Sequence, residues 1–157
     1  MRSMSRRVVA ALLLVAGLVA FSGCATPESS FPTLTNDARK AAGKGPLSTE
    51  PPGGLYFYNR AREQAEAMCR ARRVYHAPNW YSGAPAGWRA IGENVGSRLW
   101  NANDQTSWTN STNALFQSFM NSPGHKAIIL GNYNYQVVAQ HICGDGHIYV
   151  THVFVLY

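Results

Sequence analysis

Three ionisable side chains that lie far apart in the sequence, His76, Glu93 and His125, are the best candidates for chemistry. Glu93 belongs to the run Gly92-Glu93-Asn94-Val95, and His125 ends the run Asn121-Ser122-Pro123-Gly124-His125. Imidazoles and a carboxylate that face a shared cleft can bind a divalent cation or transfer protons. We therefore expect these three side chains to meet in one place.

Other familiar catalytic patterns are missing from the sequence. It contains no Gly-x-Ser-x-Gly elbow, no His-Glu-x-x-His helix, no Cys-x-x-Cys pair and no phosphate-binding loop. The chain has only eight acidic residues, and Glu93 has no evident second carboxylate for a glycosidase pair. Ser122 precedes a proline at a predicted helix end, which does not suit a nucleophile. Binding is therefore favoured over catalysis.

The N-terminus has the features of a secretory signal. Arg2, Arg6 and Arg7 precede an apolar run from Val8 to Phe21, and small residues follow it. A membrane-spanning helix needs about 20 apolar residues, and this run is shorter. We interpret residues 1–23 as a signal peptide; a retained N-terminal anchor is the alternative.

Cys24 follows Phe-Ser-Gly and resembles the Cys of a bacterial lipobox, which is acylated and becomes the new N-terminus. Phe21 departs from the usual Leu, so ordinary cleavage nearby stays an alternative. Ser5-Arg6-Arg7 is compatible with twin-arginine export, although two adjacent Arg are common in basic leaders and the general secretion route is the alternative. We expect an exported protein, held at the membrane or envelope through a lipid on Cys24 and otherwise secreted.

The cysteine count fits this interpretation. There are three Cys residues, and lipidation of Cys24 would leave Cys69 and Cys143 as a pair. An oxidising compartment would allow these two to form a disulfide. Two free buried thiols are the alternative.

The formal net charge of +6 does not indicate a nucleic-acid partner. Three of the positive charges lie in the predicted leader, at Arg2, Arg6 and Arg7, which leaves +3 for the rest. The tightest remaining cluster, Arg70 with Arg72 and Arg73, fits the solvated face of a helix. We expect no binding of nucleic acid.

Residues 24–32 are expected to form a tether, and residues 33–157 a single domain. Periodicity, capping residues and turn residues predict its elements. The predicted helices are Thr33–Ala42, Leu55–Tyr75, Thr112–Met120 (capped by Ser111) and His125–Leu130. The predicted strands are Ala90–Leu99, Gln136–Cys143 and His147–Leu156, the last two joined by an Asp-Gly turn. This order of helices and strands, with a C-terminal β-hairpin, predicts an α+β fold.

Five short segments resemble, in order, those of the CAP superfamily, which comprises the cysteine-rich secretory, venom antigen and pathogenesis-related proteins, in its bacterial SCP-domain form. They are Asn36-Asp37-Ala38-Arg39 with Pro46-Leu47, the helix around Ala61 and Met68, His76, Gly92-Glu93-Asn94-Val95, and Ser122-Pro123-Gly124-His125-Lys126. The resemblance covers about residues 33–157. It implies a three-layer α/β/α sandwich.

The resemblance also implies a cavity, which in many eukaryotic members has two His and two Glu that can hold a divalent cation. His76 matches the first His and Glu93 the first Glu. Ser122 stands where the second Glu is expected, and Tyr133 or Asn134 where the second His is expected. The tetrad is therefore half present in this chain.

Two ligands make a weak metal site, whereas zinc sites normally have three or four. His125 could supply the third ligand beside His76 and Glu93, which would allow a divalent cation such as zinc. The alternatives are purely structural: His76 hydrogen-bonded to Glu93, Glu93 bracing a loop through backbone amides, and Asn94 joining backbone groups. For His125 the alternative is a locally bonded residue at a helix start.

The expected site comprises His76, Glu93, Asn94, Ser122, His125 and Tyr133. Aromatic residues are plentiful in the predicted loops: Trp80, Tyr81, Trp88, Trp100, Trp108, Tyr133 and Tyr135. They could line a groove for a sugar or lipid, or they could cover small apolar clusters beneath the loops. The leading functional interpretation is a protein that binds a lipid, a glycan or another protein. A metal-assisted hydrolase or protease, and an envelope adhesion or scaffold protein, are the rivals.

Overall fold

The computed structural model describes residues 30–53, 55–80, 82–100 and 106–157. The predicted signal peptide, Cys24 and Tyr81 lie outside these residues. The elements follow one another in the order α1 (Phe31–Ala41), α2 (Leu55–Ala71), β1 (Ala90–Leu99), α3 (Ser107–Asn121), α4 (Pro123–Ile129), β2 (Tyr135–Ile142) and β3 (His147–Leu156). None of the helices in this described part is long and apolar enough to cross a membrane.

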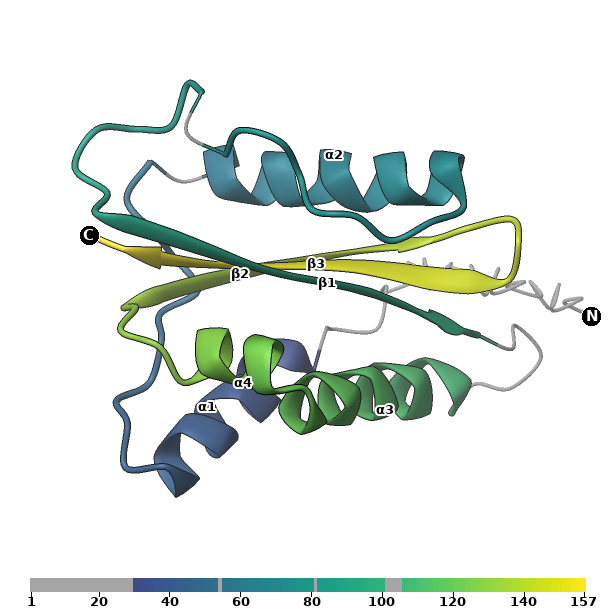
Figure 1. Cartoon of the computed structure of the whole chain (residues 1–157), viewed down its shortest axis with the longest axis horizontal. Helices are drawn as coiled ribbons and strands as arrows, with labels where there is room; N and C mark the ends of the chain where they lie inside the picture. Colours follow the sequence, from purple (N-terminus) through teal and green to yellow (C-terminus); the bar gives the residue numbers. More distant parts are fainter. Residues whose placement is uncertain (1–29, 54, 81, 101–105) are drawn as a thin grey trace, which may run out of the picture.

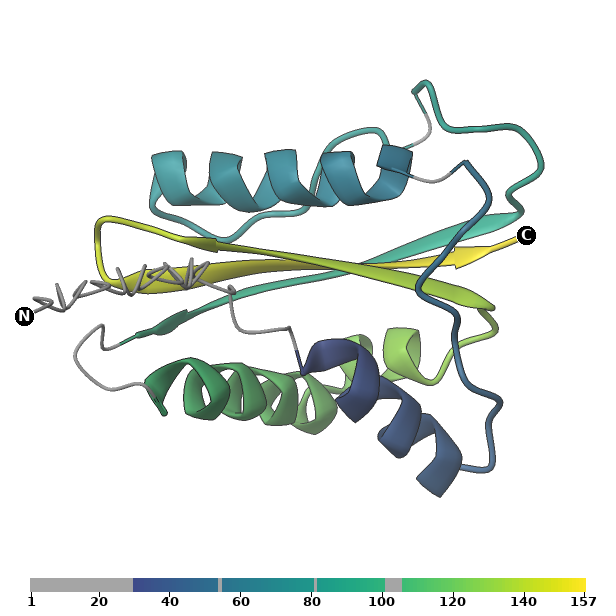
Figure 2. The same ribbon diagram turned by 180° about the vertical axis from the view of Figure 1, so that it is seen from behind.

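The three strands form one antiparallel sheet in the order β1-β3-β2, so the C-terminal strand is central. Helix α2 covers one face of the sheet, and α1, α3 and α4 cover the other (Figures 1 and 2). The prediction of an α+β fold is confirmed. The two outer strands of the sheet are therefore β1 and β2.

Residues of β3 alternate between two apolar cores, as the period of a strand requires. Val153 and Val155 pack with Phe57 of α2, whereas Val150 and Phe154 pack with helices of the other face. The same alternation holds along β1. Odd-numbered residues such as Val95 pack on the α2 side, and even-numbered ones face α3 and α4.

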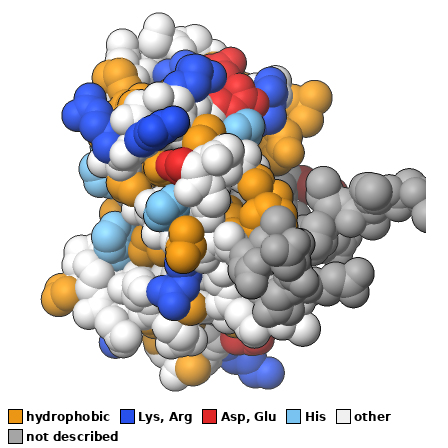
Figure 3. Space-filling view, turned by 90° about the vertical axis from the view of Figure 1, so that its right-hand side faces the viewer, with side chains coloured by type: hydrophobic (Ala, Val, Ile, Leu, Met, Phe, Trp, Pro, Cys, Tyr) orange, Lys and Arg blue, Asp and Glu red, His pale blue; other side chains and the backbone are white. Residues whose placement is uncertain are grey.

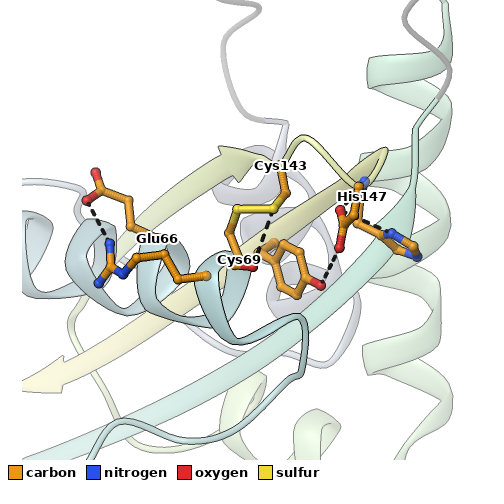
Figure 4. The surroundings of a disulfide bond; sticks show 7 residues. Glu66, Cys69, Cys143 and His147 are labelled. Carbon is orange, nitrogen blue, oxygen red and sulfur yellow. Dashed lines mark hydrogen bonds and ion pairs between the residues drawn. A yellow bond between two sulfur atoms is a disulfide. The ribbon is translucent and has the colours of Figure 1, made fainter.

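A disulfide joins Cys69, near the end of α2, to Cys143, at the start of the β2–β3 turn (Figure 4). The predicted pairing is therefore present, and the alternative of two free thiols is not. The two residues are 74 positions apart in the sequence. On the chain-entropy model, closing a loop of this size stabilises the fold by roughly 4 kcal/mol. The bond joins α2 to the β2–β3 turn, at the end of the sheet opposite the C-terminus.

Helix α1 begins two residues earlier than predicted, within the segment that was assigned to the tether. Ser30 is its N-cap residue and Pro32 lies in its first turn, a position where proline costs no hydrogen bond. Phe31 is fully buried, with its ring 5.7 Å from that of Phe116 and 5.9 Å from that of Phe119. Burial of this ring anchors the helix start, so the domain begins at the end of the predicted tether.

Helix α2 ends at Ala71, four residues before the predicted Tyr75. Arg72 has a positive φ of 50°, and the Arg73 amide donates to the Met68 carbonyl, which is the geometry of a left-handed helix terminus. The predicted buried stripe also needs correction at its start. Leu55 is 70% exposed and Tyr58 44% exposed, so in the first turn only Phe57 belongs to the buried stripe.

Helix α3 begins at Ser107, one turn before the predicted cap Ser111. Ser111 is instead a buried helical residue, and its hydroxyl donates to the Leu99 carbonyl over 3.0 Å. Helix α4 begins at Pro123 rather than at His125 and ends one residue early. Strand β2 is shifted by one residue from the prediction, whereas β1 and β3 have the predicted bounds.

A series of buried, hydrogen-bonded polar side chains joins β3, β2 and α1. The side-chain nitrogen of Gln136 donates to the Pro32 carbonyl over 3.3 Å and faces Asn36 Oδ1 at 3.4 Å. Its oxygen is left to accept from His152 Nε2 at 3.0 Å. His152 is fully buried and its Nδ1 has no hydrogen-bond partner within the described chain. The ring is therefore neutral with the proton on Nε2, and burial lowers the pKa of His152 to about 3.

This histidine makes stability depend on pH. An unfolded chain binds a proton at His152 below a pKa of about 6.5, while the folded chain does not bind it until about pH 3. We predict that the free energy of unfolding decreases as the pH falls through this window, by up to about 5 kcal/mol at 1.4 kcal/mol per pKa unit. Urea unfolding between pH 7 and pH 4 measures it.

The matched variant is His152→Gln, whose amide can still donate to Gln136 but does not titrate. We expect it to be less stable than the wild type at pH 7 and to show a smaller decrease in stability between pH 7 and pH 4. Equal pH slopes for the two proteins would show that His152 is not the residue responsible.

Candidate functional site

His76 and Glu93 lie together, as the sequence predicted. His76 Nδ1 is 2.7 Å from Glu93 Oε2, and the Ala77 amide donates to the same oxygen over 3.1 Å. The two residues differ sharply in exposure: the side chain of His76 is 64% exposed and that of Glu93 only 6% exposed. A buried carboxylate therefore holds an imidazole whose other edge faces solvent.

The environment of Glu93 opposes its charge. Burial raises the pKa of the Glu93 carboxyl, and the hydrogen bonds from His76 and from the Ala77 amide lower it only in part. The indole N–H of Trp80 also favours the charged form, although it does not reach hydrogen-bond geometry. A carboxyl with a raised pKa beside a histidine is an arrangement that suits proton transfer or ligand binding.

Two local features bring these residues together. Glu93 is an odd-numbered residue of the outer strand β1, so its side chain points to the α2 side of the sheet. The positive φ of Arg72 turns the chain back after α2, and Gln64 Nε2 of that helix then donates to the Tyr75 carbonyl. As a result, the segment from Tyr75 to Ala77 lies along β1.

Asn94 and His125 belong to the opposite face. The buried side chain of Asn94 donates from Nδ2 to the His125 carbonyl over 3.1 Å, so it fixes the start of α4 against β1. The His125 ring stacks on Phe119 with the centroids 4.7 Å apart. Burial first, and then the positive charge of His76, lower the pKa of His125. His125 is therefore neutral at pH 7 and within electrostatic reach of His76.

The predicted three-ligand metal set is not assembled. Across the described ranges, no three His, Cys, Asp or Glu side chains converge closely enough to hold a metal ion. The Nδ1 of His76 is occupied by Glu93, and His125 approaches from the other side of the sheet. This donor set does not fit a resident zinc ion. The expected contact between His76 and Glu93 is present, and within the described residues His125 does not complete a group of three such side chains.

Tyr133 and Ser122 do not join the pair. Tyr133 lies under β1 on the α4 side, and its hydroxyl would come within 2.5 Å of a Cβ atom placed on Gly92. A side chain at residue 92 would displace that ring, which favours glycine there. Ser122 separates α3 from α4, and its side chain makes no capping hydrogen bond. Tyr133 therefore packs on the α4 side of the sheet, and its ring lies 5.7 Å from that of Phe154.

Most of the aromatic residues in the predicted loops cover apolar clusters, which is the second of the two expected roles. Trp80 is buried and Trp88 packs against the same cluster as Phe57, while Trp100 and Trp108 pack on the other face. The charged side chains gather over α2, in the upper part of Figure 3. Pairs such as Arg62 with Glu66, at 2.9 Å, show that this is a solvated face with internal charge compensation.

Comparison with known proteins gives a fold but no family. No family model matches the sequence, and no curated protein matches it. The solved structure of an outer surface protein from Borrelia burgdorferi is similar, with a TM-score of 0.63 and 13% sequence identity. The match covers 80% of this chain and 89% of that chain. At this identity, the likeness concerns the fold alone.

The site predicts a specific change in local stability. In Glu93→Ala, the Ala77 amide loses its acceptor and His76 loses its partner, which removes hydrogen bonds worth about 1–3 kcal/mol when one partner is charged. Amide hydrogen exchange at Ala77 should accelerate by about tenfold or more. The control is Glu63→Ala, because Glu63 is an exposed partner of Arg60. Unchanged exchange at Ala77 in Glu93→Ala would contradict the assignment of Glu93 as the brace of this segment.

Proposed function

We propose that this chain is an exported envelope protein of CAP type that binds a ligand at the surface formed by His76 and Glu93. One observation carries the proposal: a buried carboxylate orients an imidazole that is itself largely exposed. Glu93 occupies Nδ1 of His76, which leaves Nε2 for a ligand atom. A group held this way can accept a hydrogen bond from a ligand when neutral, and donate one when protonated.

The chemistry of the surface favours a polar ligand. The groups near His76 are a carboxylate, a second imidazole within electrostatic reach and a segment of backbone. Such groups pair with hydroxyl and amide groups, whereas an acyl chain would leave them without partners. Of the three ligand classes that the CAP resemblance implies, we therefore favour a glycan or a peptide over a lipid.

An envelope location is part of the same proposal. The basic start, the apolar run and Cys24 are the features on which we infer export and a lipid anchor. The disulfide between Cys69 and Cys143 suits an oxidising compartment. The structurally similar Borrelia burgdorferi protein is described as an outer surface protein, which is compatible with this location. The five CAP-like segments support the family assignment, and helices on both faces of the sheet are compatible with it.

A hydrolase or protease at the same place is the second candidate. It is favoured by the raised pKa of the Glu93 carboxyl beside an accessible imidazole. The two imidazoles do not form a resident metal site with Glu93, so a metal-assisted reaction is the weaker form of this candidate. Metal analysis of purified protein, with peptide and cell-wall substrates, tests it. An adhesion or scaffold role would predict that Glu93→Gln has no effect.

The binding proposal predicts that His76→Ala weakens binding of cell-wall glycopeptide fragments by about tenfold or more, because one oriented hydrogen bond contributes roughly 1.5 kcal/mol when charge assists it. Titration calorimetry with defined fragments measures the change. The matched control is His147→Ala, since His147 also lies beside a carboxylate, with its Nδ1 3.3 Å from Asp145. Equal binding by His76→Ala and wild type, or no binding by the wild type, would contradict the proposal.

A further inference from the structure

A hollow lies beside α2, next to His76. The chain that follows α2 turns back and runs alongside the helix (Figure 1). The space between the two is a hollow of about 380 Å³. It is lined on the helix side by Arg60, Glu63, Gln64, Ala67 and Arg70, and on the other side by Ala77 and Pro78. Because Ala77 directly follows His76, a ligand that contacts the His76 ring is within reach of this hollow.

The hollow is long enough for a short extended chain. Arg60 and Arg70 line its two ends and are ten positions apart on one helix, which corresponds to about 15 Å along the helix axis. An extended peptide rises about 3.3 Å per residue, so four or five residues cover that distance. The ends of such a ligand would therefore lie near the two arginines.

The Arg60 end of the hollow is compensated internally. The guanidinium carbon of Arg60 is 5.8 Å from the centre of the Trp80 ring, and its Nη1 is 3.1 Å from Glu63 Oε2. Arg60 is thereby held in place by an aromatic ring and a carboxylate. The side chain of Glu63 is 55% exposed, so it can also accept a hydrogen bond from an N–H group of a ligand. This end suits donor groups rather than an anion.

The Arg70 end presents a cation that is only weakly paired. The side chain of Arg70 is 70% exposed, and its Nη1 is 4.0 Å from Glu66 Oε2. The other oxygen of Glu66 is 2.9 Å from Arg62, so this carboxylate interacts mainly with Arg62. An exposed ion pair as long as that of Arg70 contributes little to stability. Arg70 can therefore pair with an incoming carboxylate without the loss of a strong contact.

The charges around the hollow also favour an anion at the Arg70 end. Residues 55–80 contain five Arg, two Glu and neither Asp nor Lys. The buried carboxylate of Glu93, behind this segment, offsets only part of that excess. Glu63, the acidic residue that lines the hollow, is seven positions from Arg70, or about 10 Å along the helix. That distance exceeds the screening length of about 8 Å at physiological ionic strength.

We propose that this hollow is a subsite for a peptide segment that ends in a free carboxylate, and that Arg70 pairs with that carboxylate. The inference rests on the proposed binding of a ligand at His76, and it names the class of that ligand. The planar guanidinium of arginine offers two parallel N–H donors that match the two oxygens of a carboxylate. Backbone N–H groups of the peptide lie toward Glu63 at the opposite end. The two ends of the hollow thus set the direction of the peptide.

Two probes that differ in a single group test the role of the carboxylate. One is a defined cell-wall glycopeptide fragment whose peptide ends in a free carboxylate, and the other is the same fragment ending in an amide. In titration calorimetry at pH 7, the full-length wild type should bind the acid about tenfold more tightly than the amide. Equal affinity for the two would overturn the inference and leave the proposed function standing. Binding of neither would contradict the proposed function and the inference with it.

Variants of exposed arginines test whether Arg70 causes the preference. Arg70→Gln should bind both fragments with the affinity that the wild type has for the amide. Arg70→Lys keeps the charge without the two parallel donors, so it should retain only part of the preference. The matched control is Arg98→Gln, because Arg98 is an exposed residue of β1 on the α3 side of the sheet. An unchanged preference in Arg70→Gln, or an equal loss of preference in Arg98→Gln, would overturn the inference.

Discussion

The buried carboxylate of Glu93 is the constraint on which the site depends. An ionised carboxylate removed from water must be compensated, and here the compensation comes from one imidazole and one backbone amide of a single neighbouring segment. The segment after α2 is therefore fixed where the charge is. Since that segment carries His76, one interaction sets the orientation of the exposed imidazole. The raised pKa of the Glu93 carboxyl is the electrostatic cost of this arrangement.

The alternation of β1 explains why two of the three expected groups meet and the third does not. Glu93 points to the α2 side, and its neighbour Asn94 points to the other side, where it holds the His125 carbonyl. The motif Gly92-Glu93-Asn94 thus serves both faces of the sheet. Gly92 admits the Tyr133 ring, Glu93 binds the loop, and Asn94 fixes α4. His125 is close enough to His76 for the charge of His76 to lower the pKa of His125.

Sequence reasoning predicted the fold class, the bounds of β1 and β3, the pairing of the cysteines and the contact between His76 and Glu93. These depend on strand period, a strong turn signal and few candidate partners, which are local or countable properties. It failed at Phe31, Leu55 and Ser111, where the deciding factor is the position of a distant element. Phe31 starts a helix because two rings of α3 receive it, and Leu55 is exposed although it begins α2. It also did not identify Gln64 or Phe119, because nothing in their local sequence links them to the site.

The direct test of this account is the tautomer of His76. If Glu93 accepts the Nδ1 proton, nitrogen-15 NMR of the imidazole at a pH where the ring is neutral should show a protonated Nδ1 and an unprotonated Nε2. In Glu93→Ala, that preference should be lost while the ring signals of His147 stay unchanged. A neutral His76 with its proton on Nε2 in the wild-type protein would contradict the account, because the carboxylate would then not be orienting the ring.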